Sequence, residues 1–202
     1  GLLCSAGALA KKPPGDDGDR ITLEYDIHQL DSAGGAFSCW ASDLNDIGTV
    51  VGSVVDSTGE FAAYWNVVVA ADETVTSHLN PLPESNLLPE WSMFYAGGVN
   101  NLDEVVGGVR GDVGWIGLYW PSVNDDPLPL LTLSGDTDAQ PNKINDAGIV
   151  CGESDEHPVI WRVTSDGNGN PVVLGPFPLP FPLPAVAGRV SDLSEPDADG
   201  VV

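Results

Sequence analysis

The residues best able to do chemistry in this sequence are its acids, because the chain holds 30 Asp and Glu against 7 Lys and Arg. Two stretches alternate oxygen-bearing side chains with other residues, which is the ligand spacing of a calcium loop. The first stretch has Asp166, Asn168 and Asn170, and Pro171 follows where such a loop needs Gly. The second has Glu195, Asp197 and Asp199, and Gly200 follows. Both predict a weak Ca²⁺ site, and hairpin-turn chemistry explains the same residues equally well.

Arrangements for catalysis are missing from the sequence. Its histidines are isolated, with no H-E-x-x-H, no G-x-S-x-G and no P-loop pattern. His157 is a candidate ligand only if a carboxylate folds beside it, and an exposed turn residue is the simpler interpretation. Acid pairs such as Asp125-Asp126 arise by frequency alone in so acidic a chain. We therefore predict a protein that is not an enzyme and requires no cofactor, with Ca²⁺ as the one candidate and a glycoside hydrolase as the least favoured alternative.

The three cysteines, Cys4, Cys39 and Cys151, are an odd number without C-x-x-C spacing. This excludes a dense disulfide framework and argues against a zinc site. One internal bridge, Cys39 to Cys151, is the candidate within the folded body. Buried thiols in strands are the alternative.

Charge and hydropathy exclude two classes of partner. A formal net charge of −23 makes nucleic acid and anionic lipid unsuitable, since both need a basic face. No apolar run approaches the roughly 20 residues of a membrane span. Residues 1–20 are neutral, so residues 21–202 carry all the charge. Cations, glycans or a partner's basic segment could screen it, and such a surface favours an extracellular or cell-surface location.

An internal repeat organises most of the chain. Each copy has an Asn-centred hairpin turn, a β-branched run with a central Gly, and a closing Trp. Successive hairpin Asn residues lie 55 and 45 positions apart, a period typical of stacked β-units. The repeated positions are Asn45, Gly48, Gly52 and Trp65, then Asn100, Gly107 and Trp120, then Asn145, Gly148, Gly152 and Trp161. The central glycines predict close packing between neighbouring units, and the tryptophans predict a core between units.

These patterns predict an all-β fold of repeated antiparallel four-stranded units, β-propeller-like with an incomplete terminal blade. A β-sandwich or an irregular β-repeat array is the alternative. The units span about 21–80, 91–133, 139–175 and, truncated, 185–202. Ile21–His28 alternates apolar and polar residues and predicts a half-buried strand. This strand would complete the terminal blade of a closed ring, and an unclosed ring would leave a sheet edge for another chain.

The units resemble the HAF-type repeats of secreted and cell-surface bacterial proteins, whose pattern runs A-x-x-I-N-x-x-G-x-V-V-G and then A-F-x-W. Ala41–Gly52 with Ala62–Trp65 matches best, Ile144–Gly152 with Val159–Trp161 comes next, and the second copy has Asp103 at the turn Gly. The resemblance covers about residues 21–202. It implies an extracellular, propeller-like protein and no particular chemistry.

Two segments outside the repeat pattern are candidates for contacts with other copies. Residues 1–20 predict a flexible arm, either a leader remnant ending in an A-x-A pattern or a strand that pairs with a neighbouring molecule. Residues 176–184 have Pro at every even position, which predicts a polyproline II stretch. This stretch is either a stiff connector or a docking strip. The candidate interface residues are Leu2, Leu3, Leu9, Phe177 and Phe181.

Together these features predict a non-catalytic extracellular structural protein. Its copies would assemble into a surface filament, fibril or sheath through the arm and an open sheet edge, as a homo-oligomer or polymer. The alternative is a secreted propeller that binds carbohydrate or calcium. No N-x-[ST] sequon occurs, so glycans would be attached at other residues.

Overall fold

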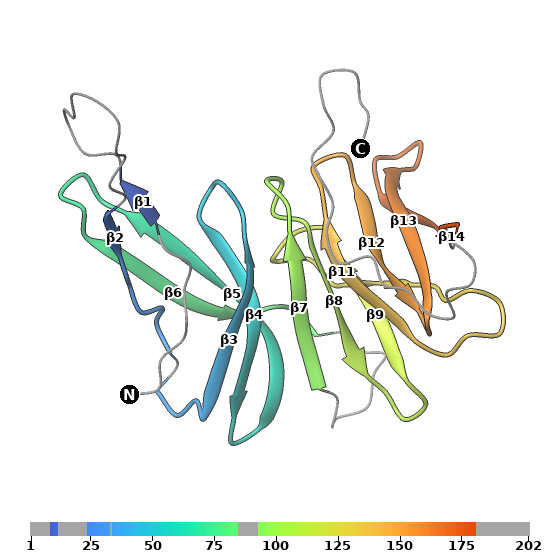
Figure 1. Ribbon diagram of the computed structural model, residues 1–202, viewed down its shortest axis with the longest axis horizontal. Helices are drawn as coiled ribbons and strands as arrows, with labels where there is room; N and C mark the ends of the chain where they lie inside the picture. Colours follow the sequence, from blue (N-terminus) through green and yellow to red (C-terminus); the bar gives the residue numbers. More distant parts are fainter. Residues whose placement is uncertain (1–8, 12–23, 33, 85–92, 181–202) are drawn as a thin grey trace.

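The computed structural model describes residues 9–11, 24–32, 34–84 and 93–180. The described residues form three four-stranded antiparallel sheets in chain order and one two-stranded sheet, with no helix among them (Figure 1). The prediction of an all-β fold built from antiparallel four-stranded units is confirmed. Within the same ranges there is no helix with the length and apolarity of a membrane span.

Each four-stranded sheet is a meander, in which strands that follow one another along the chain lie next to one another. Sheet 1 consists of β3 (Ser38–Leu44), β4 (Thr49–Asp56), β5 (Gly59–Val69) and β6 (Val75–Pro81). Sheet 2 consists of β7 (Met93–Val99), β8 (Val105–Arg110), β9 (Trp115–Trp120) and β10 (Leu128–Leu130). Sheet 3 consists of β11 (Ala139–Ile144), β12 (Ile149–Ser154), β13 (His157–Ser165) and β14 (Pro171–Pro178).

The repeated Asn closes the first hairpin of each sheet. In sheet 1 the Asn45 side-chain oxygen accepts the N–H of Thr49 at 2.8 Å, and Gly48 adopts a φ of 94°. Gly148 has the same left-handed backbone in sheet 3. Sheet 2 places Asp103 there with a φ of 60°, which a short polar side chain tolerates better than other residues do. The turn geometry is therefore retained without its glycine.

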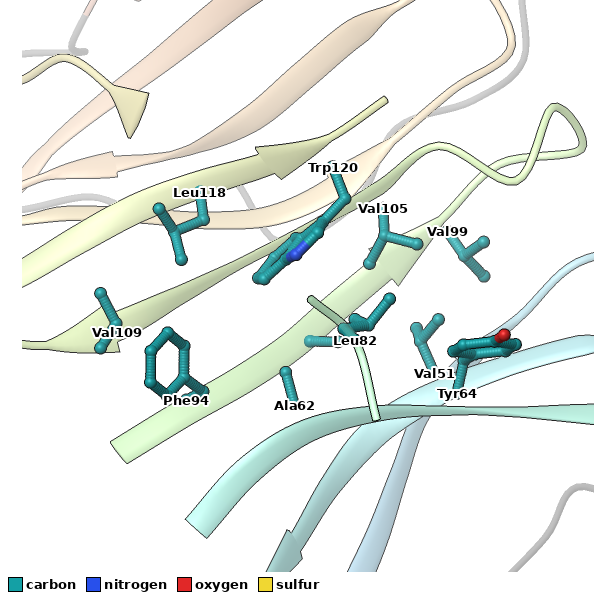
Figure 2. Close-up of a cluster of buried hydrophobic side chains, with 11 residues drawn as sticks. Val51, Ala62, Tyr64, Leu82, Phe94, Val99, Val105, Val109, Leu118 and Trp120 are labelled. Carbon is teal, nitrogen blue, oxygen red and sulfur yellow. The ribbon is translucent and has the colours of Figure 1, made fainter. Parts of the chain in front are cut away.

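The sheets stack face to face, and a repeated Trp fills each interface. Trp120 on sheet 2 is fully buried in one apolar cluster with Val51 and Tyr64 of sheet 1 and Leu82 of the connecting segment (Figure 2). Trp161 on sheet 3 is buried in the same way against sheet 2. The predicted core between units is confirmed at both positions. We call the Trp-bearing face of each sheet its upstream face, because it looks toward the preceding sheet, and the opposite face its downstream face.

Each repeated Trp also makes the same hydrogen bond. Its indole N–H donates, at 2.7 to 2.8 Å, to a carbonyl oxygen in the segment ahead of its own sheet. The three pairs are Trp65 with Asp31, Trp120 with Pro83, and Trp161 with Leu131. The residue before each acceptor is a buried leucine: Leu30, Leu82 and Leu130. These leucines and carbonyls form a further repeated element.

The central glycines allow a close backbone approach, but to a different neighbour from the one predicted. A Cβ on Gly107 would meet the carbonyl oxygen of Tyr95, which lies in β7 of the same sheet. Gly52 and Gly152 face the first strands of their own sheets in the same manner. A β-bulge in each first strand, such as that between Ala96 and Gly98, brings its backbone inward at this point. The prediction of close packing between units is therefore wrong, because the approach occurs inside each unit.

The strand predicted over Ile21–His28 ends earlier in the structure, and residues 21–23 lie outside the described residues. β2 (Glu24–Asp26) pairs with β1 (Leu9–Lys11), and Leu9 lies opposite Asp26. Ile27 is 85% exposed and lies outside the strand, so the predicted half-buried pattern is wrong at its end. The physical reason is the next stretch of chain, which crosses the upstream face of sheet 1 to bury Leu30 over Trp65.

The polyproline II prediction is wrong for residues 176–178. These residues belong to β14, where Pro178 lies opposite Val159, and the N–H of Leu179 donates to the carbonyl of Pro158 at 2.9 Å. β14 is the edge strand of sheet 3. An edge strand accommodates Pro because the missing N–H can be on its outer side.

The candidate bridge between Cys39 and Cys151 is not formed. Cys39 is disulfide-bonded, whereas Cys151 is a buried thiol. Cys39 lies in β3 of sheet 1 and Cys151 in β12 of sheet 3. Sheet 2 stands between them, so their side chains cannot meet.

Candidate functional site

The upstream face of sheet 1 differs from its two counterparts in being partly uncovered. Leu44 is 54% exposed, whereas its equivalents Val99 in sheet 2 and Ile144 in sheet 3 are 5% exposed. All three residues occupy the position just before the hairpin Asn. The preceding sheet covers Val99 and Ile144, whereas no four-stranded sheet precedes sheet 1 among the described residues. Within the described residues, its upstream face therefore matches an interface of the repeat without the neighbouring four-stranded sheet.

A groove of about 540 Å³ runs along this uncovered face. Its walls come from the 44–48 hairpin, from β5 and β6, and from residues 28–30. Leu44, Ile47, Val67, Val69 and Val75 give it an apolar lining, and polar groups such as Asp46 and Ser77 lie at its borders. The lining suits an apolar protein surface better than a small polar ligand.

A ladder of asparagine side chains crosses from sheet to sheet beside the groove. The Asn45 amide donates to the Asn100 carbonyl at 2.8 Å, and the Asn100 amide donates to the Asn145 carbonyl at 3.0 Å. All three side chains are buried. The Asn45 carbonyl in turn accepts the Gly48 N–H at 3.3 Å. The ladder therefore links the hairpin ends of all three sheets.

The residue after each Asn forms a second, exposed row of contacts. The Asp46 N–H donates to the Asn101 side-chain oxygen at 2.8 Å, and the Asn101 N–H donates to the Asp146 carboxylate at 2.8 Å. Asp103 adds an acceptor, since its carboxylate receives the Asn45 amide at 2.9 Å. Adjacent sheets are thus held in one register by polar contacts at their hairpin ends.

An ion pair ties the first sheet to the third. The Lys143 ammonium in β11 lies 2.7 Å from the Asp43 carboxylate in β3, and that carboxylate also accepts the Val99 N–H at 3.0 Å. The equivalent position in sheet 2 is Gly98, where a Cβ would come within 2.9 Å of the Lys143 Cα. Glycine therefore leaves room for the pair to form across β7.

No family model, curated protein or solved structure matches this chain. Its function is therefore inferred from its own residues and contacts.

The predicted calcium residues that are described form a hairpin turn between β13 and β14. The Asp166 carboxylate accepts the N–H groups of Asn168 and Asn170 and the Asn170 amide, at 2.8 to 3.1 Å. These donors, first the Asn170 side chain and then the two backbone groups, lower the pKa of Asp166. The described part of the chain holds no group of three potential metal ligands. The contacts of Asp166 are those of the turn interpretation.

His157 does have a carboxylate beside it. Its Nδ1 lies 3.2 Å from the Asp136 carboxylate, which also accepts the Ser154 hydroxyl at 2.8 Å. The neighbouring Asp155 carboxylate accepts the N–H groups of Asp138 at 2.8 Å and Thr137 at 3.0 Å. These contacts fasten the β12–β13 turn to the segment ahead of sheet 3.

Asp155→Asn is expected to lower stability at neutral pH and to lose its effect in acid. Hydrogen bonds from the Asp138 N–H, then the Thr137 N–H, hold the pKa of Asp155 below its usual value. The stabilisation is therefore complete above the unfolded-state pKa of about 3.9 and is lost as pH falls through the folded-state pKa. Urea unfolding of both proteins from neutral pH downward should show the difference shrinking below about pH 4. A difference that stays constant would contradict this role.

The interface residues predicted from the sequence are placed only in part. Phe177 lies in β14 and is 47% exposed, and Leu9 lies in β1. Several other predicted residues lie outside the described residues, together with the truncated unit at 185–202. They are Leu2, Leu3, Phe181, Glu195, Asp197 and Asp199.

Two features of the site were missed in the sequence. Leu30, Leu82 and Leu130 stand 15, 18 and 15 residues ahead of the hairpin Asn, so their recurrence could have been noticed. Asp43 and Lys143 occupy the same position of the repeat with opposite charges. Their pairing depends on the curvature of the stack, which no local pattern encodes.

Proposed function

We propose that this chain is a non-catalytic structural protein of the extracellular space or cell surface, whose copies assemble into a filament, fibril or sheath. The observation that carries the proposal is the uncovered upstream face of sheet 1. It is apolar and grooved, and the same face is buried by a neighbouring sheet at both later positions of the repeat. An apolar face that is shaped for stacking and left open favours association.

We also propose that the sheets are successive blades of a propeller-like array of HAF-type repeats. The first strands support this arrangement, since β3 contacts β7 and β7 contacts β11. The ion pair between Asp43 and Lys143 across β7 indicates that the sheets fan out from a common line. Residues 24–31 would then take the place of the outermost strand of a further blade. Leu30 is buried as Leu82 and Leu130 are, and the carbonyl of the residue after it accepts an indole N–H, as in the two later sheets.

The proposal places the contact at the open face and not at the arm. β1 already pairs with β2 of its own chain, so this strand has a partner without a second molecule. At the open face the side chains either line an apolar groove or hold adjacent sheets together. Neither role calls for calcium or a catalytic group.

The proposal predicts self-association that strengthens with salt. The net charge of −23 makes copies repel one another, and raising the ionic strength from about 0.01 M to about 1 M shortens the Debye length from ~30 to ~3 Å. Sedimentation velocity over a range of protein concentrations should show larger species at high salt, and negative-stain microscopy should show rods. A protein that stays monomeric under all these conditions would refute the proposal.

A further inference from the structure

We infer that the groove on sheet 1 receives sheet 3 of a second copy, so that copies add head to tail. The inference rests on the proposed function and names the two surfaces that meet. Within the chain, the downstream face of one sheet always contacts the upstream face of the next. No described four-stranded sheet covers the upstream face of sheet 1 or the downstream face of sheet 3.

The downstream face of sheet 3 carries the exposed apolar side chains that a contact with the apolar groove requires. Ile160 is the equivalent of Tyr64 and Tyr119, which are buried against the following sheet, but Ile160 itself is only half-buried. Phe177 lies opposite Ile160 in the strand register, on the same face, and is 47% exposed. Leu174 adds a further exposed apolar side chain on this face. Apolar surface is thus left open on the outer strands of this face, β13 and β14, whereas Cys151 and Glu153 on the same face are already buried.

Equivalent residues indicate how the two surfaces fit. Phe177 corresponds to Leu128 of sheet 2, which packs in the cluster between sheets 2 and 3 together with Val163 and Val173. The counterparts of Val163 and Val173 in sheet 1 are Val67 and Ser77, and both line the groove. Phe177 of one copy would therefore enter the groove of the next at the place that Leu128 occupies within the chain.

The stretch that ends at Leu30 limits which part of the face is available. It already covers Trp65 in the manner of Leu82 over Trp120. The incoming sheet would contact the remaining area, at the hairpin end, where Leu44 and Ile47 are exposed. Two different surfaces meet in this contact, so it is heterologous and produces rings or open filaments.

Two charged variants test the head-to-tail contact in the full chain. Leu44→Asp blocks the groove and Phe177→Asp blocks the opposite face. Both residues are about half exposed, so the fold should tolerate the change. Each variant alone should self-associate about a hundredfold more weakly than the wild type, because an unpaired carboxylate would be buried in an apolar contact. Val113→Asp, at an 83% exposed loop position away from both faces, is the matched control and should associate as the wild type does.

Mixing the two variants tests the polarity of the contact. The Leu44→Asp protein retains an intact sheet 3 face, and the Phe177→Asp protein retains an intact groove. Equimolar mixtures should form dimers that do not grow further, measured by sedimentation velocity. A mixture that stays monomeric, or a Phe177→Asp protein that assembles normally, would overturn the head-to-tail contact. A wild-type protein that does not associate would overturn the proposed function as well, so the two failures are distinguishable.

Discussion

Trp120→Ala is expected to lower the free energy of unfolding by about 4 kcal/mol. The indole is fully buried between sheets 1 and 2, in a cluster of apolar side chains from both (Figure 2). Its removal leaves a cavity at the interface and also deprives the Pro83 carbonyl of the N–H that it accepts at 2.8 Å. Because stacking holds the units together, the loss affects two sheets at once. Urea unfolding followed by circular dichroism measures the change.

Two further variants separate the contributions of this tryptophan. Trp120→Phe keeps most of the apolar contact and leaves only the Pro83 carbonyl unsatisfied, so it should cost about 1–3 kcal/mol. Trp40→Ala is the control, because Trp40 is about half exposed on β3, and it should cost much less. If Trp40→Ala proved as damaging as Trp120→Ala, the interface would not be the main site of stabilisation.

Gly107→Ala is expected to destabilise the protein by about 3 kcal/mol, although it adds a single methyl group. The new Cβ would meet the Tyr95 carbonyl oxygen and would lie 2.8 Å from the Ala96 Cα. Both atoms belong to the backbone of β7, which cannot rotate away as a side chain would. The bulge in that strand must move, and with it the part of β7 that packs on sheet 1. Thermal and urea unfolding should both register the loss.

Gly167→Ala is the matched control for this substitution. Gly167 lies in the turn between β13 and β14, and a Cβ there would meet no atom within 4 Å. The change should stay within about 0.5 kcal/mol of the wild type. Equal effects of the two substitutions would show that the close approach of β7 to Gly107 is not what excludes a side chain.

The hairpins and strands of this fold could be predicted because their determinants are local. Asn45 and Gly48 define a turn by side-chain hydrogen bonding and positive φ, and Thr49–Asp56 is a run that favours β-structure in any context. The role of the tryptophans followed from their size and spacing. These features repeat, so each copy supported the interpretation of the others.

The open groove could not be predicted in the same way. Leu44, Val99 and Ile144 have equivalent positions and similar side chains, yet only Leu44 is exposed, because exposure depends on which sheet lies in front. The contact made by Gly107 was misassigned because a central Gly indicates close approach without identifying the neighbour. The end of the first predicted strand was wrong because a tertiary contact of Leu30 prevails over the alternating pattern.

The ion pair between Asp43 and Lys143 has a consequence for how the molecule unfolds. In arrays where each module touches only its immediate neighbours, stability is a sum of nearest-neighbour terms and terminal modules can melt separately. Here a charged contact skips one module and joins the outer two. Melting of either outer module also breaks a contact of the module at the other end, so the described array is expected to lose its structure in a single cooperative transition.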